Sequence, residues 1–141
     1  MSSGWTEAEK AAMKERADEL RAEKGGKKKA DALADLMAKV AEMPDGERAM
    51  AERLHTLVME AAPELEPRTW YGMPAWSKDG TVLCFFQASS KFESRYSTFG
   101  FQDVAALDDG AMWPASFALV SLGPDEEARI TELVKRAVSD G

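Results

Sequence analysis

The chain has 141 residues, a formal net charge of −7, 45% hydrophobic residues and a single cysteine. This length is typical of one domain with its own core, one cysteine excludes a disulfide within the chain, and the negative charge disfavours nucleic acid and anionic membranes as partners. No run approaches the roughly 18 apolar residues of a membrane span, and the first residues lack the features of a secretory signal. We therefore expect one soluble domain, residues 1–141, in a reducing, cytoplasmic compartment.

Three helices are predicted in the first part of the chain. Thr6 and Glu9 form a capping box that begins a helix over residues 7–23, and its apolar stripe is thin. Gly25-Gly26 ends this helix, and Lys27-Lys28-Lys29 is interpreted as a solvated linker, with a nucleic-acid contact as the alternative. Apolar residues three and four positions apart predict further helices over residues 31–42 and 47–62.

Short aromatic and β-branched runs follow and indicate strands. We expect these strands over residues 68–71, 75–77, 82–87, 95–99 and 116–120. Asp79-Gly80 predicts a tight hairpin between the second and the third of them, and residues 102–107 are expected to form a helical turn. Because the runs follow one another closely, the sheet is predicted to be largely antiparallel.

The last predicted helix spans residues 124–138. Pro124 suits a first helical position, and Asp125 and Lys135 place charges that complement the helix dipole. Helices first, strands next and a final helix predict an α+β fold: an antiparallel sheet of about five strands, with helices on one face. We expect the third and last helices on that face and residues 1–45 as a helical extension packed on the core.

One segment resembles a known family. The sequence Trp70-Tyr71-Gly72-Met73-Pro74-Ala75-Trp76 is similar to the Tyr-Gly-Met-Pro-aromatic motif of the YdhG-like domains, and it follows a helix that ends in Ala61-Ala62-Pro63 as in that family. The resemblance covers residues 47–138. It implies a small α+β domain with a curved sheet, similar in shape to frataxin, and iron binding and delivery as a possible activity.

Aromatic residues around this motif are the first candidate site. Gly72 and Pro74 predict a defined bend between two strands, which in its plainest interpretation only shapes the sheet. The functional interpretation is a concave aromatic site, because tyrosine and tryptophan join an apolar body to a polar tip. Its expected ligand-binding residues are Tyr71, Met73, Trp76, Tyr96 and Trp113.

Cys84 and His55 are the candidates for catalysis. Cys84 alternates with Val82 and Phe86 along a strand, where a free cysteine is typically an inert core residue. A nucleophilic cysteine needs a nearby base, and His55 lies on a different predicted element. We assign no catalytic residue and expect a protein that is not an enzyme, with the enzyme question left open.

Carboxylates are the candidate metal ligands. Oxygen donors of this kind bind hard cations, and the alternative role is capping and solvating helices. The clusters are Asp31 with Asp35, Asp108 with Asp109, and Asp125 with Glu126 and Glu127. We therefore expect a small binding domain for a small molecule or a protein, with no cofactor. A frataxin-like iron carrier is the alternative, and its metal ligands are not assigned.

Overall fold

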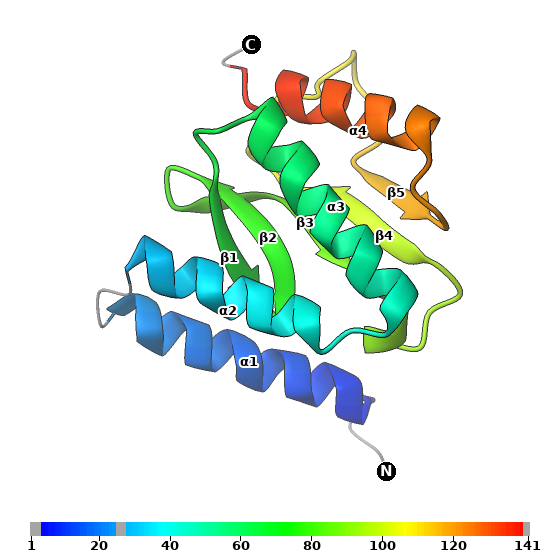
Figure 1. Cartoon of the computed structure of the whole chain (residues 1–141). Helices are drawn as coiled ribbons and strands as arrows, with labels where there is room; N and C mark the ends of the chain where they lie inside the picture. The colour runs from blue at the N-terminus through cyan, green and yellow to red at the C-terminus, as the bar shows by residue number, and fades with distance from the viewer. Residues whose placement is uncertain (1–3, 25–27, 140–141) are drawn as a thin grey trace.

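The computed structural model describes residues 4–24 and 28–139, and its strands form one antiparallel sheet (Figure 1). The strand order in the sheet is the chain order, β1-β2-β3-β4-β5, which leaves β1 and β5 as the two edges. The α+β class with a five-stranded antiparallel sheet is therefore confirmed. The strands are β1 (Glu66–Trp70), β2 (Met73–Lys78), β3 (Thr81–Gln87), β4 (Ser97–Phe101) and β5 (Ser116–Leu119).

Two-residue turns connect the first three strands. Asp79 and Gly80 have φ values of 51° and 83°, which confirms the predicted tight hairpin between β2 and β3. Tyr71 and Gly72 have φ values of 53° and 76°, so the bend predicted from the sequence is a second hairpin turn of the same kind. Two successive positive φ values match the right-handed twist of the flanking strands.

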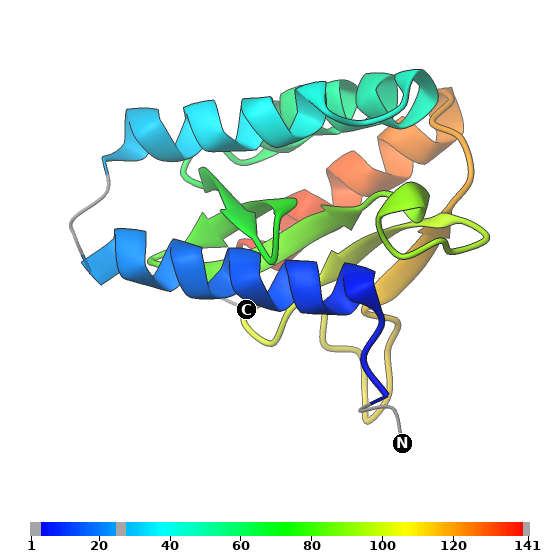
Figure 2. The same ribbon diagram turned by 90° about the horizontal axis from the view of Figure 1, so that it is seen from below.

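Three helices cover one face of the sheet, and a fourth lies beside them (Figures 1 and 2). Helices α2 (Lys29–Ala41), α3 (Asp45–Ala61) and α4 (Pro124–Ala137) lie over the sheet. Helix α1 (Glu7–Lys24) runs alongside α2 near the β1–β2 turn. Within the described residues, no helix is both long enough and apolar enough to cross a membrane.

The core lies between the sheet and the three covering helices. Trp76, Phe86 and Phe99 are its largest fully buried side chains. Each covering helix contributes an apolar stripe at helical spacing. The buried stripe residues are Leu36 and Val40 of α2, Leu54 and Val58 of α3, and Ile130 and Val134 of α4.

The structure corrects three details of the prediction. Helix α2 is part of the core and not of an added extension, because Leu36 and Val40 are fully buried in it. The helical turn expected over residues 102–107 is a single turn over residues 102–105, closed by the hydrogen bond from Ala105 N to Gln102 O. A 3₁₀ turn at Ser89–Lys91 (η1) was not expected. Gly25-Gly26 and Lys27 lie outside the described residues.

Helix α1 is attached mainly by polar contacts. Ala12 is its one buried residue. The Glu19 carboxylate accepts hydrogen bonds of 3.0 Å from both backbone N–H groups of the β1–β2 turn, at Tyr71 and Gly72. Glu15 pairs with Lys39 at 2.6 Å, and Glu23 pairs with Arg68 at 2.6 Å. The acidic side of α1 is thus bound to donors on β1, α2 and the turn.

Candidate functional site

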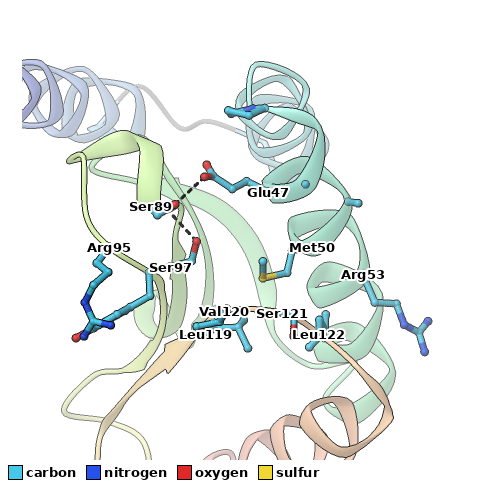
Figure 3. A pocket seen from close by; sticks show the side chains of 14 residues that line it. Glu47, Met50, Arg53, Ser89, Arg95, Ser97, Leu119, Val120, Ser121 and Leu122 are labelled. Atoms are coloured by element: carbon cyan, nitrogen blue, oxygen red, sulfur yellow. Dashed lines mark hydrogen bonds between the residues drawn. The ribbon is translucent and has the colours of Figure 1, made fainter.

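A pocket of about 540 Å³ opens where α3, the start of β4 and the chain after β5 meet (Figure 3). We call it the α3–β5 pocket. One wall is the first half of α3, and the other carries residues from η1 to the start of β4. The segment after β5 lies between them. This size falls in the range of small-molecule sites, about 300–1,000 Å³.

The floor of the α3–β5 pocket is apolar. Met50 of α3 points between helix and sheet in Figure 3, and Leu119 and Leu122 face it from β5 and the following segment. Leu119 is buried, while Met50 and Leu122 are half-buried and pack against the core. The floor is therefore an accessible extension of the core, suited to an apolar group.

Two arginines line the rim of the pocket, and Figure 3 shows both side chains pointing away from Met50. Arg53 of α3 donates two hydrogen bonds to Glu127 of α4, at 3.0 and 2.8 Å, so its charge is already balanced. Arg95 is exposed, and its guanidinium carbon lies 5.1 Å from the centre of the Tyr96 ring. No carboxylate pairs with Arg95 among residues 4–24 and 28–139. Arg95 is thus the cation at this pocket that can receive an anion.

The Glu47 carboxylate, in the wall of the pocket, accepts hydrogen bonds from two serine hydroxyl groups. Ser89 Oγ donates a hydrogen bond of 2.7 Å to Glu47, and Ser90 Oγ donates another. The backbone N–H of Ser89 in turn donates to Ser97 Oγ at 3.0 Å (Figure 3). Burial raises the pKa of Glu47, but the serine hydrogen bonds outweigh it and hold the pKa below its usual value. Glu47 therefore fixes η1 and β4 against α3.

The five residues predicted for one aromatic site lie in different places. Tyr96 lines the α3–β5 pocket and is 37% exposed. Tyr71 lines a separate hollow beside Trp5 and Phe92, and Met73 lines a third cavity near Gly72. Trp76 is fully buried, because it faces the helices. Trp113 packs against the core and lines none of these cavities. Among the described residues, these five side chains therefore do not line one of these cavities together.

Cys84 has no catalytic environment. It is 0% exposed, and burial raises the pKa of its thiol far above the ordinary value. His55 Nδ1 accepts a hydrogen bond of 3.2 Å from the Trp76 indole N–H. This nitrogen therefore serves Trp76 and does not act as a base toward the Cys84 thiol. A neutral buried thiol of this kind is not a nucleophile.

The predicted carboxylate clusters do not assemble into a metal site. Asp31, Asp108, Asp109, Asp125 and Glu126 are exposed, and Glu127 is engaged by Arg53. Within the described part of the chain, no three His, Cys, Asp or Glu side chains lie close enough to share a metal ion. Iron delivery stays a prediction that no described ligand set supports.

Sequence reasoning missed most of the α3–β5 pocket. Met50, Arg95 and Leu122 were not singled out, although Arg95 adjoins the predicted Tyr96. The available signal was an arginine and a tyrosine at the start of a strand. Their place in one pocket with Met50 depends on how the sheet packs against α3, and the local sequence does not contain that information.

Comparison with protein-family models, with curated proteins and with solved structures finds no match to this chain. The resemblance of residues 47–138 to the YdhG-like domains therefore stays a prediction drawn from the Trp70–Trp76 segment.

Proposed function

We propose that the protein is a binding domain for small organic acids, which it holds in the α3–β5 pocket. The observation that carries this proposal is Arg95, an exposed guanidinium with no carboxylate partner in the described structure, beside an apolar floor. A ligand with a carboxylate at one end and a short hydrocarbon body matches both features.

Arg95 supplies recognition of the acid. The planar guanidinium presents paired N–H donors that fit the two oxygens of a carboxylate. The Tyr96 ring lies against Arg95, so stacking limits the arginine's freedom before the ligand arrives and lowers the entropic cost of binding.

The floor supplies the affinity for the hydrocarbon body. Met50, Leu119 and Leu122 line it from two sides. Each methylene group moved from water to such a surface contributes up to about 0.8 kcal/mol. A chain of five or so carbons would thus bind weakly but measurably, once the cost of association is subtracted.

The test compares hexanoate with hexanol by isothermal titration calorimetry, on the wild type and on Arg95→Gln. We expect hexanoate to bind more tightly than hexanol, and Arg95→Gln to weaken hexanoate roughly ten-fold, because one charge-assisted contact is lost. Hexanol should bind both proteins equally. The matched control is Arg48→Gln, an arginine of α3 that pairs with Asp45 and does not line the pocket.

Two results would overturn the proposal. In the first, hexanoate and hexanol bind the wild type with equal affinity. In the second, Arg95→Gln binds hexanoate as tightly as the control Arg48→Gln does.

A further inference from the structure

Three carboxylates of α1 lie on one face of the helix. Glu15, Glu19 and Glu23 are spaced by four residues, so they follow one another about 6 Å apart along the helix axis. This face points toward the rest of the chain, because all three side chains bind groups outside α1. Helix α1 therefore docks through a row of evenly spaced negative charges.

Basic side chains bind the two outer carboxylates of this row. Glu15 lies 2.6 Å from Lys39 of α2 and 2.9 Å from Lys91 of η1. Glu23 lies 2.6 Å from Arg68 of β1. Each outer carboxylate thus meets cations from other parts of the fold.

The backbone of the β1–β2 turn binds the middle carboxylate. Tyr71 N and Gly72 N donate hydrogen bonds of 3.0 Å, one to each oxygen of Glu19. Both residues have positive φ, and successive N–H groups in such a turn form a concavity that binds anions. We call the groups beneath α1 the α1-docking surface. It consists of the ammonium groups of Lys39 and Lys91, the guanidinium of Arg68 and these two N–H groups.

The α1-docking surface is positively charged in a protein whose net charge is −7. Within the described part of the chain, Arg68 and Lys91 form ion pairs only with α1. Among the same residues, Lys39 has one acidic partner outside α1, Glu42 at 3.9 Å. Without α1, this surface would therefore present three cations and two N–H donors. That pattern is complementary to a helix with carboxylates at positions i, i+4 and i+8.

Helix α1 buries little of its own surface. Figures 1 and 2 show it at the periphery of the fold, and Ala12 is its one buried residue. Met13 and Leu20 are 39% and 45% exposed. Ion pairs that water and salt can reach contribute little to stability, so α1 should open at a lower free-energy cost than the whole protein unfolds. The α1-docking surface can therefore become accessible while the core stays folded.

We propose that the α1-docking surface binds an acidic helix of a partner protein, and that α1 occupies the surface until such a helix displaces it. The partner helix carries carboxylates at i, i+4 and i+8, the spacing at which Glu15, Glu19 and Glu23 bind. Helix α1 competes with the partner, so the apparent affinity is reduced in proportion to the fraction of molecules in which α1 is open. No residue of the surface lines the α3–β5 pocket, so the proposal does not depend on the acid site.

The first test measures, by fluorescence anisotropy, how a fluorescein-labelled peptide of residues 4–24 binds the full-length protein. The substitutions Glu15→Gln, Glu19→Gln and Glu23→Gln are made together. In the protein they loosen α1, so the unchanged peptide should bind about ten-fold more tightly than it binds the wild type. In the peptide they remove the matching charges, so binding should weaken about ten-fold. Asp18→Asn, whose ion pairs lie within α1, is the matched control and should change neither. Any other combination of effects, or no binding to the triple variant, would overturn the proposal.

The second test locates the contact by exchanging two charges, with Arg68→Glu in the protein and Glu23→Arg in the peptide. The wild type should prefer the unchanged peptide and Arg68→Glu the exchanged peptide, because only opposite charges attract. Comparing two peptides on one protein cancels the effect of Arg68→Glu on α1 itself. Arg48→Glu is the matched control, because Arg48 pairs with Asp45 of its own helix, and it should keep the wild-type preference. If Arg68→Glu also keeps that preference, the peptide binds elsewhere and the proposal fails.

Discussion

His55 is the one histidine of the chain, and its ring meets the buried Trp76. The ring centres lie 6.2 Å apart in a stacked arrangement. Nδ1 accepts the Trp76 indole N–H, so the protein needs the neutral imidazole on this side. Burial lowers the pKa of His55 below its usual value. The histidine is thus neutral at about pH 7 and satisfies a tryptophan that would otherwise be unpaired in the core.

This arrangement predicts how stability depends on pH. Because the folded pKa of His55 lies below the unfolded value, its contribution is fully present above about pH 6.5 and is lost as the pH falls through the folded pKa. His55→Gln keeps an acceptor for Trp76 and cannot titrate. We expect the free energy of urea unfolding to fall between about pH 7 and about pH 5 in the wild type, and to fall less in His55→Gln.

The contribution of the carboxylates to stability is lost in a different pH range from that of His55. Burial raises the pKa of Glu15, but hydrogen bonds from Lys39 and Lys91 outweigh it and hold the pKa below the usual value, as the serines do for Glu47. Their contribution is lost only at lower pH, below about 4.5. An equal decline in wild type and His55→Gln would contradict the role assigned to the histidine.

Trp76 shows what the local sequence lacks at the residue scale. It was expected to line a ligand site because it follows the Tyr-Gly-Met-Pro motif. It pairs across the sheet with Cys84, which was interpreted as core, so both side chains share the helix-covered face. Strand alternation predicted the burial of Cys84. Strand alternation could assign Trp76 to the buried face only together with the register of β2 against β3, which the structure supplies.

At the scale of elements, α1 is the α-helix with the smallest buried face: Ala12 is its one buried residue, whereas α2, α3 and α4 each bury at least two. Glu19 binds two backbone N–H groups of the β1–β2 turn, and both bonds are charge-assisted. Such hydrogen bonds contribute about 1.5–3 kcal/mol each at most. Gly72 also leaves room beside the turn for the Glu15 carboxylate, with which a Cβ at this position would collide.

Glu19→Ala should therefore loosen α1 selectively. We expect the amide protons of α1 to exchange faster by ten-fold or more, since an undocked helix opens locally, while those of α3 keep their protection. Asp18→Ala is the matched control, because the ion pairs of Asp18 within the described residues join it to Lys14 and Arg21 of the same helix. Equal loss of protection in α1 and α3 would show that α1 does not open separately.

Much at this scale could be predicted from the sequence. The capping box is present, with Glu9 N donating to Thr6 Oγ1 at 3.0 Å and Thr6 N donating to Glu9 at 2.8 Å. The apolar stripes of α2, α3 and α4 and the Asp79-Gly80 hairpin were also predicted correctly. The docking of α1 was not, because its partners at the turn are backbone N–H groups, which every sequence carries.

At the scale of the whole molecule, the α3–β5 pocket is built from three separate segments of the chain. It joins residues 44–53, 89–97 and 119–122. The predicted α+β class and antiparallel sheet narrow the ways in which these elements can be arranged. The pocket itself arises only where the elements meet, so the sequence alone did not locate it.

The proposed acid site is tested most directly by titrating isotope-labelled protein with hexanoate and following the backbone amide resonances. We predict shifts confined to Met50, Arg95, Tyr96, Leu119 and Leu122 and their immediate neighbours, with the β1–β2 turn unaffected. Shifts centred on Tyr71 and Gly72, or no localised shifts at all, would contradict the assignment of the binding function to the α3–β5 pocket.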